Sequence, residues 1–555
     1  MGKSINKVSM MVGYKEYEIY CIQEKLEKTI LEGNYNEAKK ILGNYQKRKM
    51  AALPPHQQYI MKMKAAIALE QQDYARAQKY VEDAIEMTLP YFSIETLDKY
   101  LLGEEEWTLI IMWLQCGLYL GNGEVHKQCM TLVSVLDKRQ LDVEMQIALY
   151  PKLTWLLAES LRQNDKEEQA ESAVRKTLDL LVENTSLFFL PQILEILMHI
   201  AVKKMDKAES ARIKQQIDAL KWSYESSGMR MPDAGINLWV TNRQNKIYLI
   251  AEAVRQERKQ SNLTQDKLAE KAGLDIKTLS RIENGANLPK PGTFRKLMDA
   301  IDCEYDIYRT NLITDDFSLL ELEWEIAGEI MRENYQGARE LLKEMERGLL
   351  LDFKENKQYL LYMTIILDVR ENRLDLYEAI DLCVQAFEVT RVYEPKCFEI
   401  VVLSVQEIII INFIAKLYRK FGKERKAILL LEYALAGFDN SKVEDRYHYR
   451  ELSLLLESLS IYCEISDELD KALAYCKRGI NLQLICGRGG LLGSFLMQKI
   501  CIEERIEKDR KNCQMNYCRV YRLLELLKME KDKYALEKYY SKQFRRNIFD
   551  DVNKN

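Results

Sequence analysis

Apolar side chains recur every three to four residues along most of this chain, which is the period of an amphipathic helix. Residues 57–89 show the pattern well. Ile60 and Ile67 fall on one face of a first helix, and the polar residues 71–73 then interrupt the pattern. Val81 lies on the apolar face of the helix that follows. The sequence therefore predicts a hairpin of two antiparallel helices.

The hairpin at 57–89 has relatives elsewhere in the chain. Tyr74, which opens its second helix, has a counterpart in Tyr35, which lies 39 residues earlier. Far downstream, residues 332–339 (RENYQGAR) echo residues 32–39 (EGNYNEAK). Hairpins repeated in this way stack into an array, because each buries its apolar face against the next.

These units resemble the tetratricopeptide (TPR) repeat, although its Trp-x-x-Leu-Gly signature is missing. We therefore expect TPR-like helical repeats over residues 1–225 and again over residues 312–545. Residues 226–246 have the composition of a linker. The alternative is a generic helical solenoid in which the alanines and tyrosines serve only packing, and no residue of the arrays is assigned a ligand.

Between the arrays, residues 262–285 show two short helices joined by a sharp turn. Thr264 is a good N-cap for the first helix, and Gly273 permits the backbone at which that helix ends. Asp275 caps the second helix, and Leu279 marks its buried face. This spacing is typical of a helix-turn-helix motif.

The motif resembles the phage-repressor/Cro (XRE) family of transcriptional regulators, through its Thr-Gln, Leu-Ala, Ala-Gly and Ile-Glu-Asn-Gly segments. The resemblance implies that the second helix enters the major groove of double-stranded DNA. The DNA-binding residues that it implies are Gln265, Asp275, Ile276, Lys277, Thr278, Ser280, Arg281, Asn284 and Lys290.

Each of these side chains suits a different part of DNA. Lys277 and Arg281 can donate to guanine O6 and N7. Asn284 and Lys290, in the loop after the reading helix, would hold the phosphate backbone. Gln265 would brace the reading helix and contact phosphate from the preceding helix.

The same resemblance pairs Arg258 with Glu283 in a buried ion pair. Together these patterns predict an all-α protein. Two TPR-like arrays flank a central, small, five-helix lambda-repressor-like DNA-binding domain at residues 247–304.

Composition agrees with a helical chain of several domains, since 555 residues exceed a single core and only 9 prolines and 23 glycines interrupt them. A net charge of -4 excludes a broadly basic protein that coats nucleic acid. Residues 247–303 carry ten basic and eight acidic side chains, a local charge of +2. Few phosphate contacts follow, so we expect a homodimer that places two reading helices on one DNA.

Other classes of protein find no support. The twelve cysteines form no CxxC pair and the four histidines lie far apart, so no metal site is expected. The sequence has no P-loop, no Gly-x-Ser-x-Gly and no His-Glu-x-x-His, so neither an enzyme nor a cofactor is expected. The apolar run at 398–415 contains Glu399 and Glu407, which favours a buried helix over a membrane span. Because no secretory signal is evident, we expect a cytoplasmic protein with no membrane partner.

We therefore expect a sequence-specific DNA-binding transcriptional regulator. It resembles the peptide-responsive regulators of Gram-positive bacteria, which implies a peptide or protein ligand on the concave face of the repeats. The alternative is a TPR-like protein-interaction scaffold, in which the central domain only localises the protein or binds another protein.

Overall fold

The computed structural model describes residues 10–139, 141–164, 166–231, 237–241, 247–301, 312–314, 316–507 and 510–552. These residues are almost wholly helical, and the predicted all-α class is confirmed. By internal contacts the chain forms two compact units: the first comprises Met1–Lys7, Lys15–Gln244 and Gln483–Asn555, and the second Val8–Tyr14 and Asn245–Leu482. The repeat boundaries expected from the sequence, 1–225 and 312–545, follow the order of hairpins along the chain and stay a prediction.

The first unit is built from helices that pack as successive hairpins, such as α3 with α4, α7 with α8 and α9 with α10. Its elements are α1 (Tyr14–Leu31), α2 (Tyr35–Gln46), the 3-10 helix η2 (Lys49–Ala52), α3 (Pro54–Glu70), α4 (Tyr74–Glu86), η3 (Ile94–Lys99), α5 (Glu104–Tyr119), α6 (Val125–Lys138), α7 (Val143–Arg162), α8 (Glu167–Glu183), α9 (Leu190–Lys203), α10 (Lys207–Glu225), α23 (Leu492–Glu507), α24 (Arg510–Leu526), α25 (Glu530–Phe544) and α26 (Ile548–Val552).

The second unit holds a small helical domain followed by further hairpins, including α15 with α16 and α19 with α20. Its elements are β1 (Met10–Val12), β2 (Ile247–Leu249), α11 (Ile250–Gln260), α12 (Gln265–Ala272), α13 (Ile276–Glu283), α14 (Pro291–Ile301), α15 (Phe317–Met331), α16 (Tyr335–Gly348), α17 (Lys354–Arg370), α18 (Leu376–Glu388), η4 (Pro395–Ile400), α19 (Val405–Lys420), α20 (Glu424–Asp439), η5 (Asp445–His448), α21 (Tyr449–Ile465) and α22 (Leu469–Ile485).

Small side chains at the helix crossings explain the close packing of the hairpins. Ala38, Ala77 and Ala338 are completely buried, and each follows an N-cap Asn or Asp by four residues. Asp73, for example, accepts a hydrogen bond from the Arg76 amide at 3.2 Å, which satisfies a backbone donor that the helix leaves free. The cap and the alanine therefore fix where each second helix begins and how near it lies to its neighbour.

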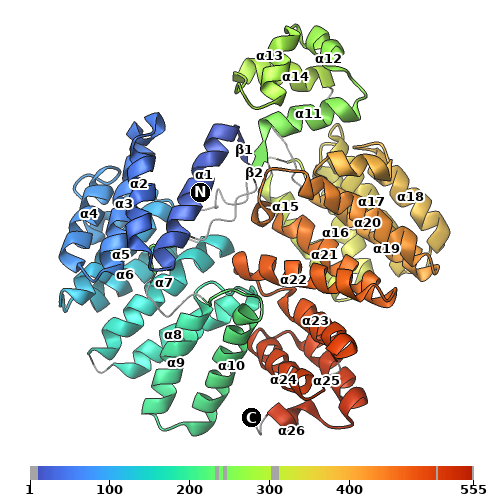
Figure 1. Cartoon of the computed structure of the whole chain (residues 1–555). Helices are drawn as coiled ribbons and strands as arrows, with labels where there is room; N and C mark the ends of the chain where they lie inside the picture. Colours follow the sequence, from blue (N-terminus) through green and yellow to red (C-terminus); the bar gives the residue numbers. More distant parts are fainter. Residues whose placement is uncertain are drawn as a thin grey trace. The chain divides into compact units, whose positions relative to one another are not determined.

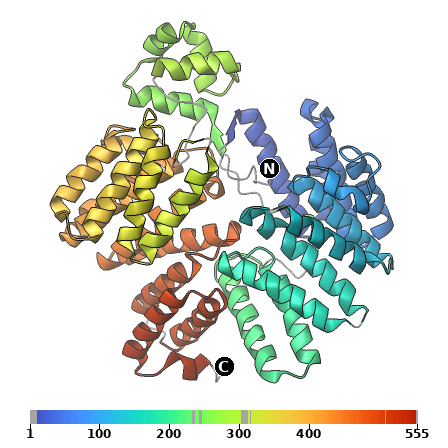
Figure 2. The same ribbon diagram turned by 180° about the vertical axis from the view of Figure 1, so that it is seen from behind.

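Two features differ from the helical prediction. The strands β1 and β2 pair in parallel, with Met10 opposite Ile247 and Val12 opposite Leu249, and helical periodicity gives no signal for such a short pairing. Four helices, α11–α14, form the central domain in the part of the chain that the structure describes, and the end of the predicted domain, 302–304, lies outside it. Both ribbon views show these four helices as one group (Figures 1 and 2).

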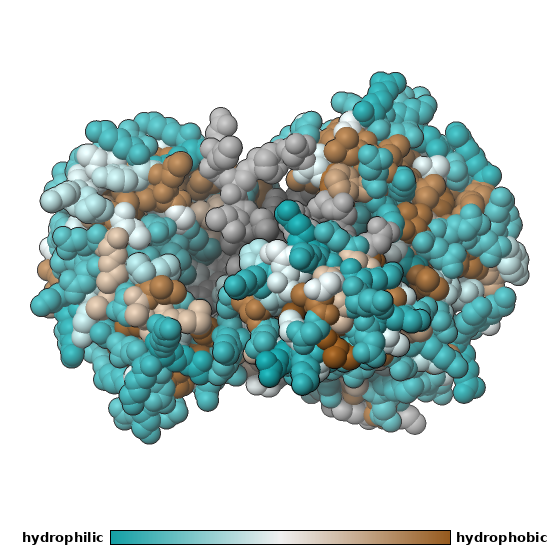
Figure 3. Space-filling model, turned by 90° about the horizontal axis from the view of Figure 1, so that it is seen from above, coloured by the Kyte–Doolittle hydropathy of each residue, from teal (hydrophilic) through white to brown (hydrophobic). Residues whose placement is uncertain are grey.

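The outer faces of the helices are polar, as amphipathic helices require. Hydrophilic side chains cover most of the face drawn in Figure 3, and hydrophobic ones appear there in separate patches. None of the described helices is both long enough and apolar enough to cross a membrane.

Candidate nucleic-acid interface

Two capped helices with a glycine between them form the centre of the candidate site. Thr264 caps α12 by accepting a hydrogen bond from the Lys267 amide at 3.2 Å. Gly273 ends that helix at a φ of 63°, in the left-handed region that a side chain disfavours. Asp275 then caps α13, accepting from the Thr278 amide at 2.9 Å. The turn between the two helices is therefore fixed by local chemistry.

Burial divides the side chains of α13 into two sets. Leu279 and Ile282 are buried against the other helices of the domain. Lys277 and Arg281 are exposed, and Ile276 keeps 41% of its surface exposed although it is a large apolar residue. The outer face of α13 thus presents two exposed cations and one partly exposed apolar side chain.

The polar residues around α13 take different positions. Asn284 and Lys290, in the loop that follows α13, are exposed. Thr278 and Ser280 are half-buried, and Ser280 Oγ accepts a long 3.4 Å hydrogen bond from the side-chain Nδ2 of Asn284. These side chains thus lie on α13 or in the loop directly after it, and four of the polar ones, Lys277, Arg281, Asn284 and Lys290, are exposed.

Asp275 has a structural role in the described chain. Its carboxylate accepts from both the amide and the hydroxyl of Thr278. These hydrogen bonds, the hydroxyl's first, lower the pKa of the Asp275 carboxyl from its usual value. The residue therefore shapes the start of the reading helix through its cap, and its negative charge is consistent with that role and with the helix dipole.

A buried ion pair joins α11, the first helix of the domain, to α13. Glu283 accepts hydrogen bonds from Arg258 Nε at 2.6 Å and from Arg258 Nη2 at 2.9 Å. The side chain of Glu283 is 1% exposed and that of Arg258 is 11% exposed. Arg258 also donates to the Leu263 carbonyl at 2.8 Å, and Gln265 donates to Glu283 Oε2 at 2.7 Å. The carboxylate of Glu283 thus links three helices of the domain, α11, α12 and α13.

The N-terminal strand adds a support that sequence patterns do not reveal. Tyr14, two residues after β1, packs so closely on Gly285 that a Cβ atom there would overlap its ring. Lys442 Nζ lies 4.6 Å from the centre of the same ring. Burial, followed by the charge of Glu252, raises the pKa of Tyr14. The loop that begins with Asn284 therefore packs, through Gly285, on Tyr14, which is far away in the sequence.

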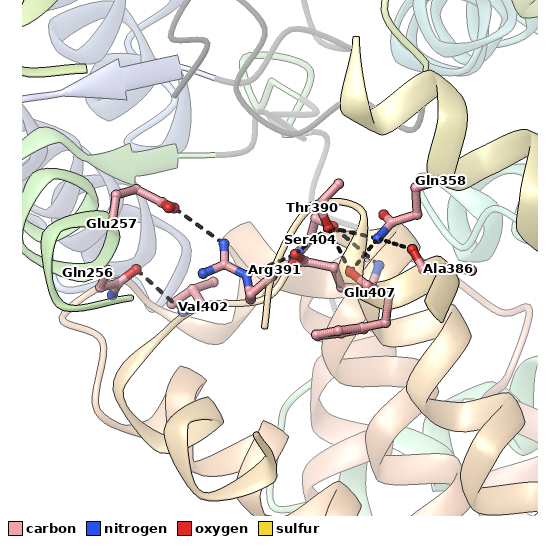
Figure 4. Close-up of polar contacts among 10 residues, drawn as sticks. Gln256, Glu257, Gln358, Ala386, Thr390, Arg391, Val402, Ser404 and Glu407 are labelled. Carbon is pink, nitrogen blue, oxygen red and sulfur yellow. Dashed lines mark hydrogen bonds and ion pairs between the residues drawn. The ribbon is translucent and has the colours of Figure 1, made fainter. Parts of the chain in front are cut away.

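Helix α11 also docks on the repeats of its own unit (Figure 4). Glu252 is 4% exposed and accepts from Ser441 Oγ at 2.8 Å and from the Lys442 amide at 3.1 Å. One turn later, Gln256 accepts from the Val402 amide at 3.4 Å. The contact uses the face of α11 that bears these polar groups, so α13 stays exposed.

Arg391 is a largely buried cation of this contact, with a side-chain exposure of 10%. It donates to Glu257 at 3.3 Å and to Glu407 at 2.8 Å, and Glu407 is only 3% exposed. Thr390 also donates to Glu407 at 3.1 Å, and Gln358 donates to Thr390 at 2.7 Å. Figure 4 shows how these groups connect α11 to α17, α18 and α19. The positions of Glu257 and Arg391 are too far apart in sequence for a local motif to predict.

Comparison with known proteins identifies one family in this chain. A family model described as "Helix-turn-helix" matches residues 254–308, which contain the helices and caps described above. No curated protein matches the chain.

Solved structures show only distant likeness. PlcR of Bacillus thuringiensis, in complex with the peptide PapR7 and DNA, is 16% identical over 52% of this chain and 98% of its own, with a TM-score of 0.35. The apo form of the competence regulator ComR from Streptococcus vestibularis is 14% identical over 53% of this chain and 97% of its own, with a TM-score of 0.29. ComR from S. thermophilus, in complex with DNA and its signalling peptide ComS, is 14% identical over 52% of this chain and 97% of its own, with a TM-score of 0.30. Likenesses at this level carry no argument about what the present chain does.

Proposed function

We propose, from the premise that residues 254–308 form a helix-turn-helix domain of the XRE type, that this protein is a sequence-specific DNA-binding transcriptional regulator. The observation that carries the proposal is the exposed outer face of α13, where Lys277 and Arg281 stand free of the domain's core. Both can reach guanine O6 and N7 in the major groove, while Ile276 suits a thymine methyl. The caps at Thr264 and Asp275 orient this face before any DNA is bound.

Phosphate contacts complete the proposed interface. Asn284 and Lys290 lie in the loop after α13, where backbone-directed residues of such a motif are placed. Gln265 is turned toward Glu283, so we propose that it acts mainly by bracing α13. The repeats would then bind a peptide or protein ligand on a concave face, since stacked hairpins provide such a surface.

The proposal is tested by fluorescence anisotropy of the full-length protein with labelled genomic fragments at a fixed salt concentration. A regulator selects a few fragments over the rest, whereas a scaffold with a protein-binding central domain binds none of them above random DNA. The salt concentration must be held constant, because contacts with DNA phosphates alone make the affinity depend steeply on ionic strength.

Replacing Arg281 by Ala should weaken binding to the selected fragment by about 1–3 kcal/mol and relax the preference at one base pair. The reason is that a guanidinium on a base edge contributes to one position of the site only. Lys296→Ala removes an exposed cation on α14 and serves as the matched control. Equal losses on selected and random DNA would assign Arg281 to phosphate.

Replacing Lys290 by Ala should lower affinity on all sequences alike and reduce the slope of log affinity against log salt by about one unit. A phosphate contact releases counterions regardless of the base sequence. The measurement is a salt titration on the selected fragment and on random DNA. An unchanged slope would remove Lys290 from the set of phosphate contacts.

A further inference from the structure

Several helices before the DNA-binding domain have counterparts of equal length after it. α3 and α17 both span 17 residues, η3 and η4 both span 6, α5 and α19 both span 16, and α8 and α22 both span 17. Their first residues are 54 and 354, 94 and 395, 104 and 405, and 167 and 469, so the offset stays between 300 and 302. Irregular repeats that arose separately would not keep this spacing over four pairs.

Buried polar contacts repeat at offsets within the same range, 300 for the donor glutamine and 302 for its two acceptors. Gln58 donates to the Ala84 carbonyl at 3.0 Å and to Thr88 Oγ1 at 2.9 Å. Gln358, 300 residues later, donates to the Ala386 carbonyl at 3.1 Å and to Thr390 at 2.7 Å. A buried glutamine with the same two partners is a specific solution to a packing problem, so its recurrence indicates common descent.

The capping of α5 and α19 repeats as well. The Gly103 amide donates to Glu106 at 3.0 Å, and the Ser404 amide donates to Glu407 at 2.7 Å. At the other end of each helix an aromatic pair stacks across a hairpin: Tyr74 with Tyr119 at 4.6 Å in one copy, and Tyr377 with Phe421 at 3.8 Å in the other. The cap residues are 301 residues apart and the aromatic residues 303 and 302 apart, so both kinds of contact recur close to the offset of the helices.

Equivalent segments of the two copies contact each other inside the first compact unit. The Leu187 amide donates to the Gly487 carbonyl at 2.8 Å, and the Gly489 amide donates to the Thr185 carbonyl at 2.6 Å. With the offset of 302, Thr185 corresponds to Gly487 and Leu187 to Gly489. Each copy therefore gives the other the same backbone groups, which is the defining property of an isologous, two-fold contact.

Further contacts extend this two-fold interface. Helices α10 and α24, which follow the equivalent helices α9 and α23, pack against each other. Arg522, 7% exposed, donates to Gln215 at 2.7 Å, and Lys499, 6% exposed, donates to the Ser226 carbonyl at 3.3 Å. Charged side chains buried to this extent belong to a permanent interface, because exposing them again would leave their partners unsatisfied.

We infer that this chain is a tandem duplication that encloses within itself the two-fold interface of a homodimer, and that it therefore acts on DNA as one chain with one reading helix. The surface that would join two separate chains is already occupied by the second copy. That the single chain binds DNA through one reading helix rests on the proposed function, whereas the duplication and its internal interface do not. The expected DNA site is therefore a single half-site, in place of the inverted repeat expected for a homodimer.

The two copies differ where the DNA-binding domain docks. Val402, whose amide bonds to Gln256 of α11, is 3% exposed. Its counterpart at the offset of 301 is Leu101, which is 90% exposed. The second copy thus carries the docked domain, and the equivalent position of the first copy is open in the described chain. One reading domain per pair of copies agrees with a single half-site.

Sedimentation of the full-length protein without DNA tests the inference directly. The expected mass is that of one chain, 65.2 kDa, across about a hundredfold range of concentration. A species of twice this mass overturns it. On the fragment selected by anisotropy, one chain per DNA is expected, and two chains on an inverted repeat would contradict the single half-site. A monomer that binds no DNA would support the duplication with its internal interface and would contradict the proposed function.

Gly489→Ala and Gly490→Ala form a matched pair for the interface. A Cβ atom at Gly489 would lie 2.8 Å from Leu527 and 3.1 Å from the Thr185 carbonyl, whereas at Gly490 the nearest atom is at 3.4 Å. We expect Gly489→Ala to lower the thermal midpoint by about 2–4 °C with the mass unchanged, and Gly490→Ala to have a smaller effect. A wild-type dimer that Gly489→Ala converts to monomers would show that the interface joins two chains.

Discussion

Replacing Glu283 by Ala should destabilise the DNA-binding domain by about 3–5 kcal/mol, because it leaves a buried cation without its partner. Arg258 keeps only 11% of its side chain exposed and directs two nitrogens to the lost carboxylate. Gln265 loses its acceptor as well. Hydrogen exchange of the full-length protein measures the effect, as faster exchange of amides in α11, α12 and α13.

Glu270→Ala is the control for this variant, since it removes an exposed carboxylate from α12 and should change exchange little. If amides of α13 exchanged at the same rate in both variants, the ion pair would not hold the domain together. DNA affinity is expected to fall in Glu283→Ala as a consequence of the loosened domain, equally on all sequences.

Replacing Arg391 by Ala should lower the free energy of unfolding of the second compact unit by about 3–5 kcal/mol. Glu407, at 3% exposure, would keep a buried negative charge with its cation removed, and Glu257 would lose its link to the repeats. Denaturant unfolding followed by circular dichroism measures the loss.

Arg373→Ala supplies the comparison, because Arg373 is 61% exposed and bonds to Glu371 at 3.4 Å on the surface. Such exposed pairs contribute only about 0–1 kcal/mol. Equal losses in the two variants would mean that Arg391 is no more important than a surface residue. Helix α11 should also exchange faster in Arg391→Ala, whereas the exposed face of α13 is unaffected by the substitution itself.

Periodicity and capping chemistry were enough to predict the hairpins and the helix-turn-helix, since both depend on residues close together in sequence. Tyr74 and Ala77 begin α4 next to their cap, and Thr264, Gly273 and Asp275 fix the turn between α12 and α13. Each of these signals acts over a few residues, and a single sequence displays it directly.

The parts that escaped prediction depend on long-range contacts. Tyr14 supports Gly285, and Glu257 pairs with Arg391, across separations at which no spacing rule operates. The echo of residues 32–39 at 332–339 pointed to a second array, but the constant offset became visible only with the helix boundaries and the buried partners of Gln358. The homodimer expected from the modest local charge stays a prediction, and the internal two-fold contact favours the single chain instead.

A small positive charge and one reading helix limit what the single chain can do on DNA. The local charge of +2 allows few phosphate contacts, so affinity should be moderate and strongly reduced by salt. Docking of α11 on the repeats should raise the affinity for DNA, because a domain held in one orientation loses less conformational freedom when it binds. A ligand that alters the repeats could act on DNA binding through this contact.

Selection of DNA sequences from a random pool by the full-length protein tests whether α13 reads DNA. Wild-type protein is expected to enrich one short motif, and the double variant Lys277→Ala, Arg281→Ala is expected to enrich none while it remains folded. Enrichment of the same motif by both proteins, or of no motif by the wild type, would contradict the account that α13 reads DNA.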